Sequence, residues 1–87
     1  MIKLVRIGTA GPLELSLDFS DGSVGIWSAA DIVARDTILT RGLGDPIYFA
    51  RAFIEAGSLA WPNGLELSAA SLQRRLDEAG RLTRRAA

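Results

Sequence analysis

Apolar and polar residues alternate without a break along residues 13–19, LELSLDF. Successive side chains of a β-strand point to opposite faces of a sheet, so this alternation predicts a half-buried strand. The strand is followed by a turn signal, which indicates that it begins a hairpin. The apolar face of the predicted strand carries Leu13, Leu15, Leu17 and Phe19.

An Asp-Gly dipeptide at residues 21–22 separates this strand from a second strand-like segment, SVGIWS at residues 23–28. Asp-Gly favours a two-residue type I′ turn, which places Ser16 opposite Trp27. Trp27 is then either covered by another element or exposed for a partner. In this register the apolar face gains Val24 and Ile26, and the outer face carries Glu14, Ser16, Asp18 and Trp27.

The residues after the hairpin predict a short helix, AADIVAR at residues 29–35. Ser28 and Asp31 are three residues apart and resemble a capping box in which Asp replaces the usual Glu. Ile32 and Val33 are expected to face the core of the protein.

A loop is predicted over residues 39–46, LTRGLGDP, because two glycines and a proline fall within five residues. At the end of this loop Asp45 is a favourable helix N-cap, and Pro46 is favourable as the first helical residue. We therefore expect one or two helical turns through residues 46–50.

The next segment, residues 51–57, is compatible with two structures. Phe49 and Phe53 have the i,i+4 spacing of a helix that would continue to Gly57. The same residues could instead begin a strand near Ala52. Residue propensities do not decide between the two.

The run WPNG, residues 61–64, lies between two strand-like segments. A two-residue loop at residues 63–64 would place Pro62 inside the strand ladder, where it has no N–H to donate. A three-residue loop that ends in a left-handed glycine pairs Trp61 with Leu65 and separates apolar from polar residues. The pattern favours this second loop and a structural role for the motif. The apolar face of the hairpin would then carry Leu59, Trp61, Leu65 and Leu67.

A final helix is predicted from Ser68, a favourable N-cap, to Gly80, a favourable end. Residues 81–87, RLTRRAA, are expected to be frayed. We therefore expect a single domain over residues 1–80 followed by a basic tail. The apolar stripe of the final helix consists of Leu72, Leu76 and Ala79.

The composition argues against most kinds of catalytic site. The 87 residues, 48% of them hydrophobic, suffice for one small core. The chain has no cysteine, which excludes disulfides and cysteine-ligated zinc, and no histidine, the commonest general base near neutral pH. Its serines therefore lack a histidine that would activate them. We expect no catalytic residue, no metal site and no cofactor, and we favour a non-enzymatic protein.

Ten basic and ten acidic residues balance, so the net charge does not indicate a nucleic-acid partner. The distribution is uneven, because five arginines and two carboxylates from Arg74 onward give that part a charge of +3. Such a run either contacts phosphates or forms a solvated helix face, for which Asp77 and Arg81 have favourable spacing. The candidate anion contacts are Arg74, Arg75, Arg81, Arg84 and Arg85.

No stretch of about 18 apolar residues occurs, as a membrane-spanning helix would need. The start of the chain, MIKLVRI, carries a charge at every third residue and lacks the apolar run of a signal peptide. We therefore expect a cytoplasmic bacterial protein with no membrane contact.

Three motifs follow one another along the chain: FSDGS at 19–23, DPIYF at 45–49 and WPNGLEL at 61–67. In this order they resemble the motifs of a bacterial family catalogued as domain of unknown function 2442, and the resemblance covers roughly residues 3–76. The resemblance implies a two-layer α+β fold with a meandering antiparallel sheet of about five strands and two or three short helices packed on one face. It also implies a strand at residues 52–55, with Ile54 opposite Leu59. No activity is established for the family, so no site residue carries over.

The leading hypothesis is a non-enzymatic protein–protein interaction module, either a homodimer or bound to a small partner protein. The resemblance implies a setting in a toxin-antitoxin-like or mobile-element gene pair. One alternative is a nucleic-acid-linked regulatory accessory protein that uses the C-terminal arginines. Another is a small-molecule-binding protein or an enzyme of unknown type. Because tryptophan is enriched at binding hot spots, the candidate interaction surface consists of Trp27, Asp18, Ser16 and, if residues 52–55 are a strand, Phe53.

Overall fold

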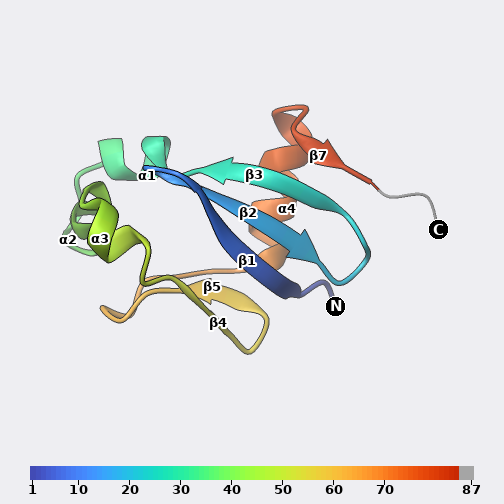
Figure 1. The fold of residues 1–87 in the computed structure, drawn as a ribbon, viewed down its shortest axis with the longest axis horizontal. Coiled ribbons are helices and arrows are strands. Elements are labelled where there is room, and N and C mark those ends of the chain that lie inside the picture. Colours follow the sequence, from blue (N-terminus) through green and yellow to red (C-terminus); the bar gives the residue numbers. More distant parts are fainter. Residues whose placement is uncertain (85–87) are drawn as a thin grey trace.

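The computed structural model describes residues 1–84, which form two antiparallel sheets and several short helices (Figure 1). The predicted α+β class is confirmed, whereas the expected single sheet of about five strands is wrong. The first sheet has the strand order β1-β2-β3-β7 and contains β1 (Leu4–Gly11), β2 (Glu14–Phe19), β3 (Val24–Ser28) and β7 (Leu82–Thr83). The second sheet has the order β4-β5-β6 and contains β4 (Phe53–Glu55), β5 (Ser58–Ala60) and β6 (Glu66–Leu67).

The two sheets meet at the start of β1 but do not merge. The Leu4 N–H donates a hydrogen bond to the Gly57 carbonyl at 2.8 Å. The pairing of β1 with β2 is irregular between Leu4 and Arg6. Such a bulge bends a strand and interrupts its ladder. β4, β5 and β6 pair among themselves in a separate sheet.

The helices are short, as expected. They do not all pack on one face of one sheet, so that part of the prediction is wrong. In Figure 1, α4 lies behind the first sheet, while α2 and α3 gather at one end of the molecule. The helical segments are α1 (Ala30–Ala34), α2 (Ile38–Arg41), the 3₁₀ helix η1 (Gly42–Gly44), α3 (Pro46–Phe49) and α4 (Ala69–Glu78).

The first predicted helix exists as α1, but its capping box does not form. Ser28 lies one residue before the N-cap, Ala29, and its Oγ accepts a hydrogen bond from the Ala30 N–H at 3.2 Å. Ile32 is buried and Val33 is half-buried, as predicted.

The loop predicted over residues 39–46 is wrong, because α2 and η1 occupy most of it. Thr37 and Thr40 start α2 by a reciprocal cap: each Oγ1 accepts from the other residue's N–H, at 3.2 and 3.1 Å. Asp45 caps α3 as predicted, since its Oδ1 accepts from the Ile47 N–H at 3.0 Å. The closely spaced glycines had favoured a loop here. The cap at Thr37 precedes them in the chain and starts a helix instead.

The loop between β2 and β3 has three residues instead of the predicted two. The Phe19 N–H donates to the Ser23 carbonyl at 2.9 Å, and the Gly22 N–H donates to the Phe19 carbonyl at 3.0 Å. Gly22 has a φ of +89°, in the left-handed region that favours glycine. The glycine therefore ends a three-residue loop at its third position.

This additional loop residue shifts the register of the first hairpin. Leu15 lies opposite Trp27, and Ser16 lies opposite Ile26. Because a one-residue shift moves every side chain of a strand to the other face, Trp27 points inward while Val24 and Ile26 point outward. The predicted faces of β3 are wrong.

The two hairpins of the second sheet agree with the predictions. β4 exists as a strand, and its Ile54 lies opposite Leu59 of β5. The predicted three-residue loop at WPNG is confirmed: the Trp61 N–H donates to the Leu65 carbonyl at 3.0 Å, and the Gly64 N–H donates to the Trp61 carbonyl at 3.1 Å. Gly64 has a φ of +95°.

One hydrophobic core joins both sheets to the helices. The rings of Trp27 and Trp61 lie 6.3 Å apart between centroids, and those of Phe49 and Trp61 lie 5.9 Å apart. The Trp61 indole Nε1 donates to the Phe49 carbonyl at 3.1 Å, so its polar atom is satisfied inside the core. The buried members are Leu4, Leu15, Leu17, Phe19, Trp27, Ala29, Ile32, Leu43, Phe49, Leu59, Trp61, Ala69, Leu72 and Leu76.

The final helix, α4, begins and ends where the sequence predicts. The Ser68 side chain caps its first turn. Leu72 and Leu76 are buried, but Ala79 is exposed and does not belong to the apolar stripe. Gly80, with a φ of +69°, follows the end of the helix.

The prediction that the chain frays after α4 is wrong for residues 81–84. The chain turns back and adds β7 to the edge of β3, with Leu82 opposite Gly25 and Thr83 opposite Val24. The folded domain therefore includes this part of the predicted tail. The remainder of that tail lies outside the described residues.

Candidate interaction surface

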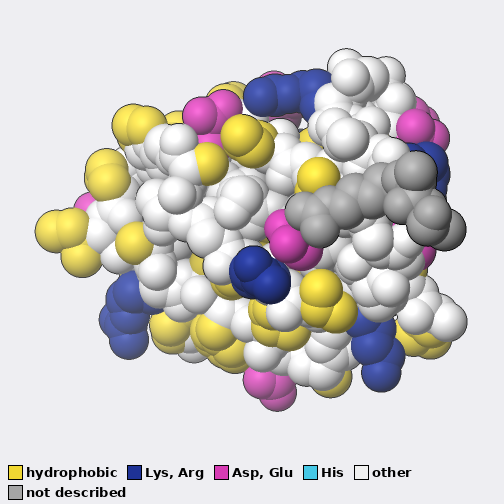
Figure 2. All heavy atoms as spheres, turned by 45° about the vertical axis from the view of Figure 1, so that its right-hand side comes forward, with side chains coloured by type: hydrophobic (Ala, Val, Ile, Leu, Met, Phe, Trp, Pro, Cys, Tyr) yellow, Lys and Arg dark blue, Asp and Glu magenta, His cyan; other side chains and the backbone are white. Residues whose placement is uncertain are grey.

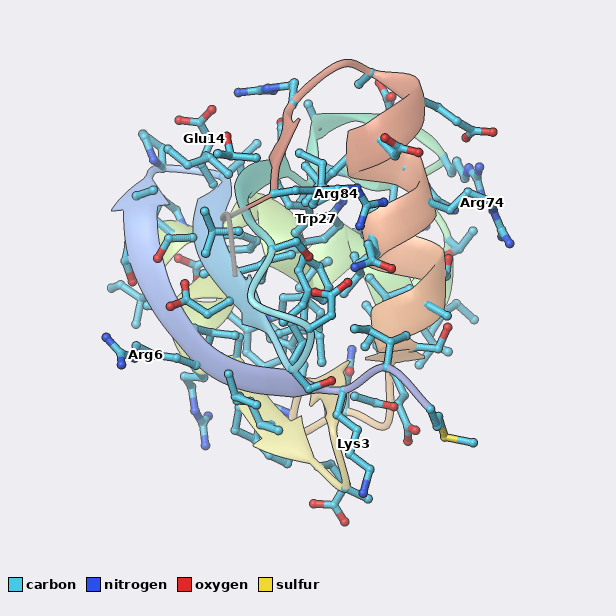
Figure 3. The ribbon with its side chains drawn as sticks, turned by 90° about the vertical axis from the view of Figure 1, so that its right-hand side faces the viewer. Lys3, Arg6, Glu14, Trp27, Arg74 and Arg84 are labelled. Carbon is cyan, nitrogen blue, oxygen red and sulfur yellow. The ribbon has the colours of Figure 1, made fainter. Side chains whose placement is uncertain are left out.

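Trp27, the residue predicted to lead an outer interaction surface, is buried. Its exposed fraction is 4%, and Figure 3 shows its side chain between the first sheet and α4. The register explains this position, because Trp27 shares the inner face of the sheet with Leu15. Trp27 belongs to the core, and of the two alternatives, cover by another element is correct.

The outer face of the first sheet carries two of the predicted residues, Ser16 and Asp18. Asp18 lies opposite Val24, and Ser16 lies opposite Ile26. An antiparallel sheet usually presents polar residues on its solvated face, but β3 presents two β-branched apolar residues there. Ile26 is 43% exposed. We refer to the surface formed by Ser16, Asp18, Val24 and Ile26 as the outer face.

Two adjoining hollows lie on the outer face and share Asp18 and Val24. The larger, of about 500 Å³, extends to Arg81 and Thr83. The smaller, of about 290 Å³, extends to Val5, an exposed apolar residue in the bulged part of β1. The apolar surface of this face is therefore wider than β3 alone.

Charged side chains of both signs flank these apolar residues. Arg6 Nε lies 4.0 Å from Asp18 Oδ2, and Arg81 Nη2 lies 3.8 Å from Glu14 Oε2. Such solvent-exposed pairs contribute little to stability. Figure 2 shows acidic, basic and hydrophobic side chains side by side near the middle of its view. An apolar centre with a polar rim is the usual composition of a protein interface.

Phe53 is not part of the outer face. Its strand, β4, pairs with β5 in the second sheet, where Phe53 lies opposite Ala60. Phe53 therefore shares no sheet with Ser16 and Asp18, and its predicted grouping with them is wrong. The prediction assumed one continuous sheet.

The candidate anion contacts fall into two groups. Arg74 and Arg75 are exposed on α4, and Figure 3 shows Arg74 on the side of α4 away from the first sheet. Arg81 and Arg84 approach carboxylates of the first hairpin, at 3.8 and 3.6 Å. Arg85 lies outside the described residues. Because two of these arginines already pair with carboxylates, phosphate contact through the tail has less support from the geometry than from the sequence.

A further hollow, of about 360 Å³, lies between the end of β3, α1 and the last turn of α4. Trp27, Ile32 and Leu76 supply apolar lining, and charged residues of both signs complete it. Its volume lies within the range of small-molecule sites. The outer-face hollow of about 500 Å³ lies within the same range, so both hollows are candidates under the small-molecule hypothesis. The charged residues that line the hollow of about 360 Å³ are Asp31, Arg75, Glu78 and Arg81.

Asp21 joins the loop of the first hairpin to α4 and to the segment after it. Its Oδ1 accepts from the Ser23 Oγ at 2.6 Å and the Ser23 N–H at 2.9 Å, and its Oδ2 accepts from Gln73 Nε2 at 2.8 Å. Arg84 Nη1 lies 3.6 Å from Oδ2. The Ser23 hydrogen bonds, then those from Gln73 and the Arg84 charge, lower the pKa of Asp21 from 3.8 to about 2. Asp21 is thus a fixed anionic anchor.

The sequence-based reasoning missed a set of exposed apolar side chains at the end formed by α2 and α3. Ile38 is 87% exposed, Ile47 is 79% exposed, and Leu39 is also exposed. Asn63 of the WPNG loop holds this end in place: its Nδ2 donates to the Leu39 carbonyl at 3.0 Å, and its N–H donates to the Tyr48 Oη at 2.9 Å. The available signal was the pair of adjacent apolar residues Ile38, directly before the predicted loop, and Leu39, its first residue.

The part of the chain that the structure describes contains no group of three or more acidic side chains placed to hold a metal ion. Over residues 1–84, no helix has the length and apolar character needed to cross a bilayer.

No protein-family model, curated protein or solved structure matches this chain. The resemblance to domain of unknown function 2442 therefore stays a prediction that rests on its three motifs.

Proposed function

We propose that this protein is a non-enzymatic protein–protein interaction module that forms a homodimer through the outer face of its first sheet. The observation that carries this proposal is the outward position of Val24 and Ile26 on β3. Both line a hollow of about 500 Å³, and Ile26 is 43% exposed. Burying this surface against a partner would remove apolar area from water, which is the main driving force of association.

The charges around the outer face favour a second copy of the chain as the partner. Arg6 and Arg81 are matched by Asp18 and Glu14, so the face carries as many positive as negative groups. In a dimer with a two-fold axis the same surface meets itself. A balanced surface avoids repulsion in this arrangement and lets the arginines of one copy approach the carboxylates of the other.

The shape of the surface also suits self-association. Two sheets that pack face to face interdigitate the side chains of their contacting faces. Val5, Val24 and Ile26 would form the apolar centre of such a contact. The outer face has no large aromatic side chain that would anchor the contact, so we expect a dissociation constant of the dimer in the micromolar range.

Sedimentation velocity of the full chain over a wide concentration range tests the proposal. We expect a reversible monomer–dimer equilibrium. Ile26→Asp places an unpaired carboxylate at the centre of the contact and should weaken the dimer by about tenfold or more. Ile47→Asp makes the same change at an exposed isoleucine of α3 and should leave the dimer unchanged.

A wild-type chain that stays monomeric at every concentration contradicts the proposal. Equal weakening by the two variants contradicts the choice of the outer face as the contact surface.

A further inference from the structure

The strand β7 has a small attachment to the rest of the first sheet. It pairs with β3 at two positions, Leu82 with Gly25 and Thr83 with Val24. Leu82 is half-buried and Thr83 is exposed. A short edge strand with so little buried surface opens more readily than the central strands of a sheet.

β3 is nevertheless shaped to receive this segment. Gly25 has no side chain, and a Cβ atom there would lie 2.8 Å from Leu76 Cδ1 and 2.9 Å from the Arg81 carbonyl oxygen. These distances are too short for ordinary packing. The glycine therefore admits the backbone that follows α4, whichever copy of the chain supplies it.

The remaining anchors of this segment are side chains on the first hairpin. Arg81 lies 3.8 Å from Glu14, and Arg84 lies 3.6 Å from Asp21. Together with Val24 and Gly25, these carboxylates lie within residues 14–25. A second copy of the chain offers the same set of partners in the same arrangement.

A hinge precedes β7. Gly80 has a φ of +69°, and nothing lies within 4 Å of the position that its side chain would occupy. If Gly80 adopted a helical φ, α4 would continue and the following residues would leave their own sheet. A free glycine hinge beside a lightly anchored terminal element permits exchange of that element between copies.

β7 also borders the proposed dimer contact. Arg81 and Thr83 line the same hollow as Val24 and Ile26. In two copies that meet around this hollow, β7 of each copy would therefore lie beside the contact.

We infer that β7 is exchanged in the dimer, so that the β7 of each copy pairs with the β3 of the other. This inference rests on the proposed homodimer and names the segment that links its two copies. Every contact that β7 makes with the first hairpin is re-formed in the exchanged dimer, so the cost of exchange lies in the change at Gly80 and in the contacts of this segment with its own α4, such as the hydrogen bond from the Arg81 N–H to the Leu76 carbonyl at 2.8 Å. The outer faces then supply the surface that favours the dimer over two closed monomers.

Cysteine cross-linking tests the exchange, because the chain contains no cysteine of its own. Val24 and Thr83 are direct partners across the ladder, so oxidation of a V24C/T83C variant links β7 to whichever β3 it pairs with. Exchange predicts a disulfide-linked dimer on a denaturing, non-reducing gel. A β7 retained within its own copy predicts an internally closed monomer.

Two further variants provide a control for the cross-linking and a test of the hinge. Glu55 and Ser58 are partners in the hairpin of β4 and β5, which cannot exchange without opening that hairpin, so E55C/S58C should give closed monomers. Adding Gly80→Ala to V24C/T83C should raise the linked dimer roughly fivefold, because alanine disfavours the left-handed backbone of the closed form. An unchanged linked fraction contradicts the hinge at Gly80.

The two proposals fail in different ways. Val24 lies in the proposed contact, so the reduced V24C/T83C variant is first sedimented to find the concentrations at which it is a dimer. Closed monomers after oxidation at those concentrations overturn the exchange and leave the homodimer standing. A wild type that sediments only as a monomer overturns the homodimer and the exchange with it.

Discussion

Two loops of this protein share one backbone design and serve different parts of the molecule. FSDGS at residues 19–23 closes the first hairpin, and WPNGL at residues 61–65 closes the hairpin of β5 and β6. In each loop the aromatic N–H donates to the carbonyl four residues later, at 2.9 and 3.0 Å, and the glycine N–H donates back to the aromatic carbonyl, at 3.0 and 3.1 Å. Each glycine has a backbone conformation in the left-handed region.

The Asx residue before each glycine completes the same loop. Asp21 Oδ1 accepts from the Ser23 N–H at 2.9 Å, and Asn63 Oδ1 accepts from the Leu65 N–H at 3.0 Å. The spacing aromatic-x-Asx-Gly is therefore compatible with one loop geometry in both places. An Asp-Gly dipeptide considered without its neighbours indicates a shorter turn.

The two loops differ in what the other side-chain atom of the Asx residue contacts. Asp21 Oδ2 accepts from Gln73 and lies beside Arg84, which ties the first loop to α4 and the segment after it. Asn63 Nδ2 donates to the Leu39 carbonyl, which ties the second loop to α2. An Asx oxygen completes both loops, and the contacts beyond each loop suit Asp in the first and Asn in the second.

The largest difference between the loops should come from their buried aromatic residues. Trp61→Ala should lower the free energy of unfolding by about 3–5 kcal/mol, through the cavity it leaves. This loss should be larger than the loss caused by Phe19→Ala, because Trp61→Ala also removes the indole N–H that donates to the Phe49 carbonyl. Urea unfolding followed by far-ultraviolet circular dichroism measures both losses. A larger loss for Phe19→Ala would contradict this ranking.

The two glycines should respond alike. Gly22→Ala and Gly64→Ala place alanine at φ values of +89° and +95°, with nothing within 4 Å of either side-chain position. Each should cost about 1–2 kcal/mol of unfolding free energy, from backbone strain alone. The urea midpoints of the two variants should therefore fall by similar amounts. A clear loss at one site and none at the other would show that the loops are not equivalent.

The smallest effects should come from exchanging the Asx residues. Asn63→Asp keeps the oxygen that the loop needs but removes the donor to the Leu39 carbonyl, and should cost about 1 kcal/mol near neutral pH. Asp21→Asn also keeps the loop oxygen, but it removes the charge that faces Arg84.

The Asp21 variant should be recognised by its pH dependence. The pKa of Asp21 is lowered from 3.8 to about 2, so its contribution to stability is present above pH 3.8 and is lost as the pH falls toward 2. The urea midpoint of the wild type should therefore fall more steeply over this interval than that of Asp21→Asn. Identical pH profiles would contradict the role of Asp21 as an ionised anchor.

The sequence pattern distinguished the registers at one loop and not at the other. At WPNG, only the three-residue loop keeps Pro62 out of the ladder and separates apolar from polar residues. At the first hairpin, β3 has apolar residues at consecutive positions, Ile26 and Trp27, so either of its faces can be buried. The packing of Trp27 against Trp61, 6.3 Å away between ring centroids, selects the face that is buried.

The sequence pattern likewise predicted the candidate surface only in part. Ser16 and Asp18 occupy the outer face as predicted, because the alternation of β2 assigns their side independently of any partner strand. Trp27 and Phe53 do not, since their positions depend on which strands pair and in which register. Ile38 directly precedes the predicted loop, and Ile47 lies in the short helix predicted over residues 46–50. Both were missed because segments this short have no apolar periodicity from which an exposed face could be assigned.

Features that arise from neighbouring residues could be predicted from the sequence: the strand at residues 13–19, the caps at Asp45 and Ser68, the loop at WPNG, and the absence of cysteine and histidine chemistry. The burial of Trp27, the addition of β7 to the edge of β3, and the long-range partners of Asp21 and Asn63 depend on the folded structure. Gln73 is 52 residues from Asp21, and Leu39 is 24 residues from Asn63. The free energy of contacts between such distant residues depends on how the whole core packs, which no local pattern contains.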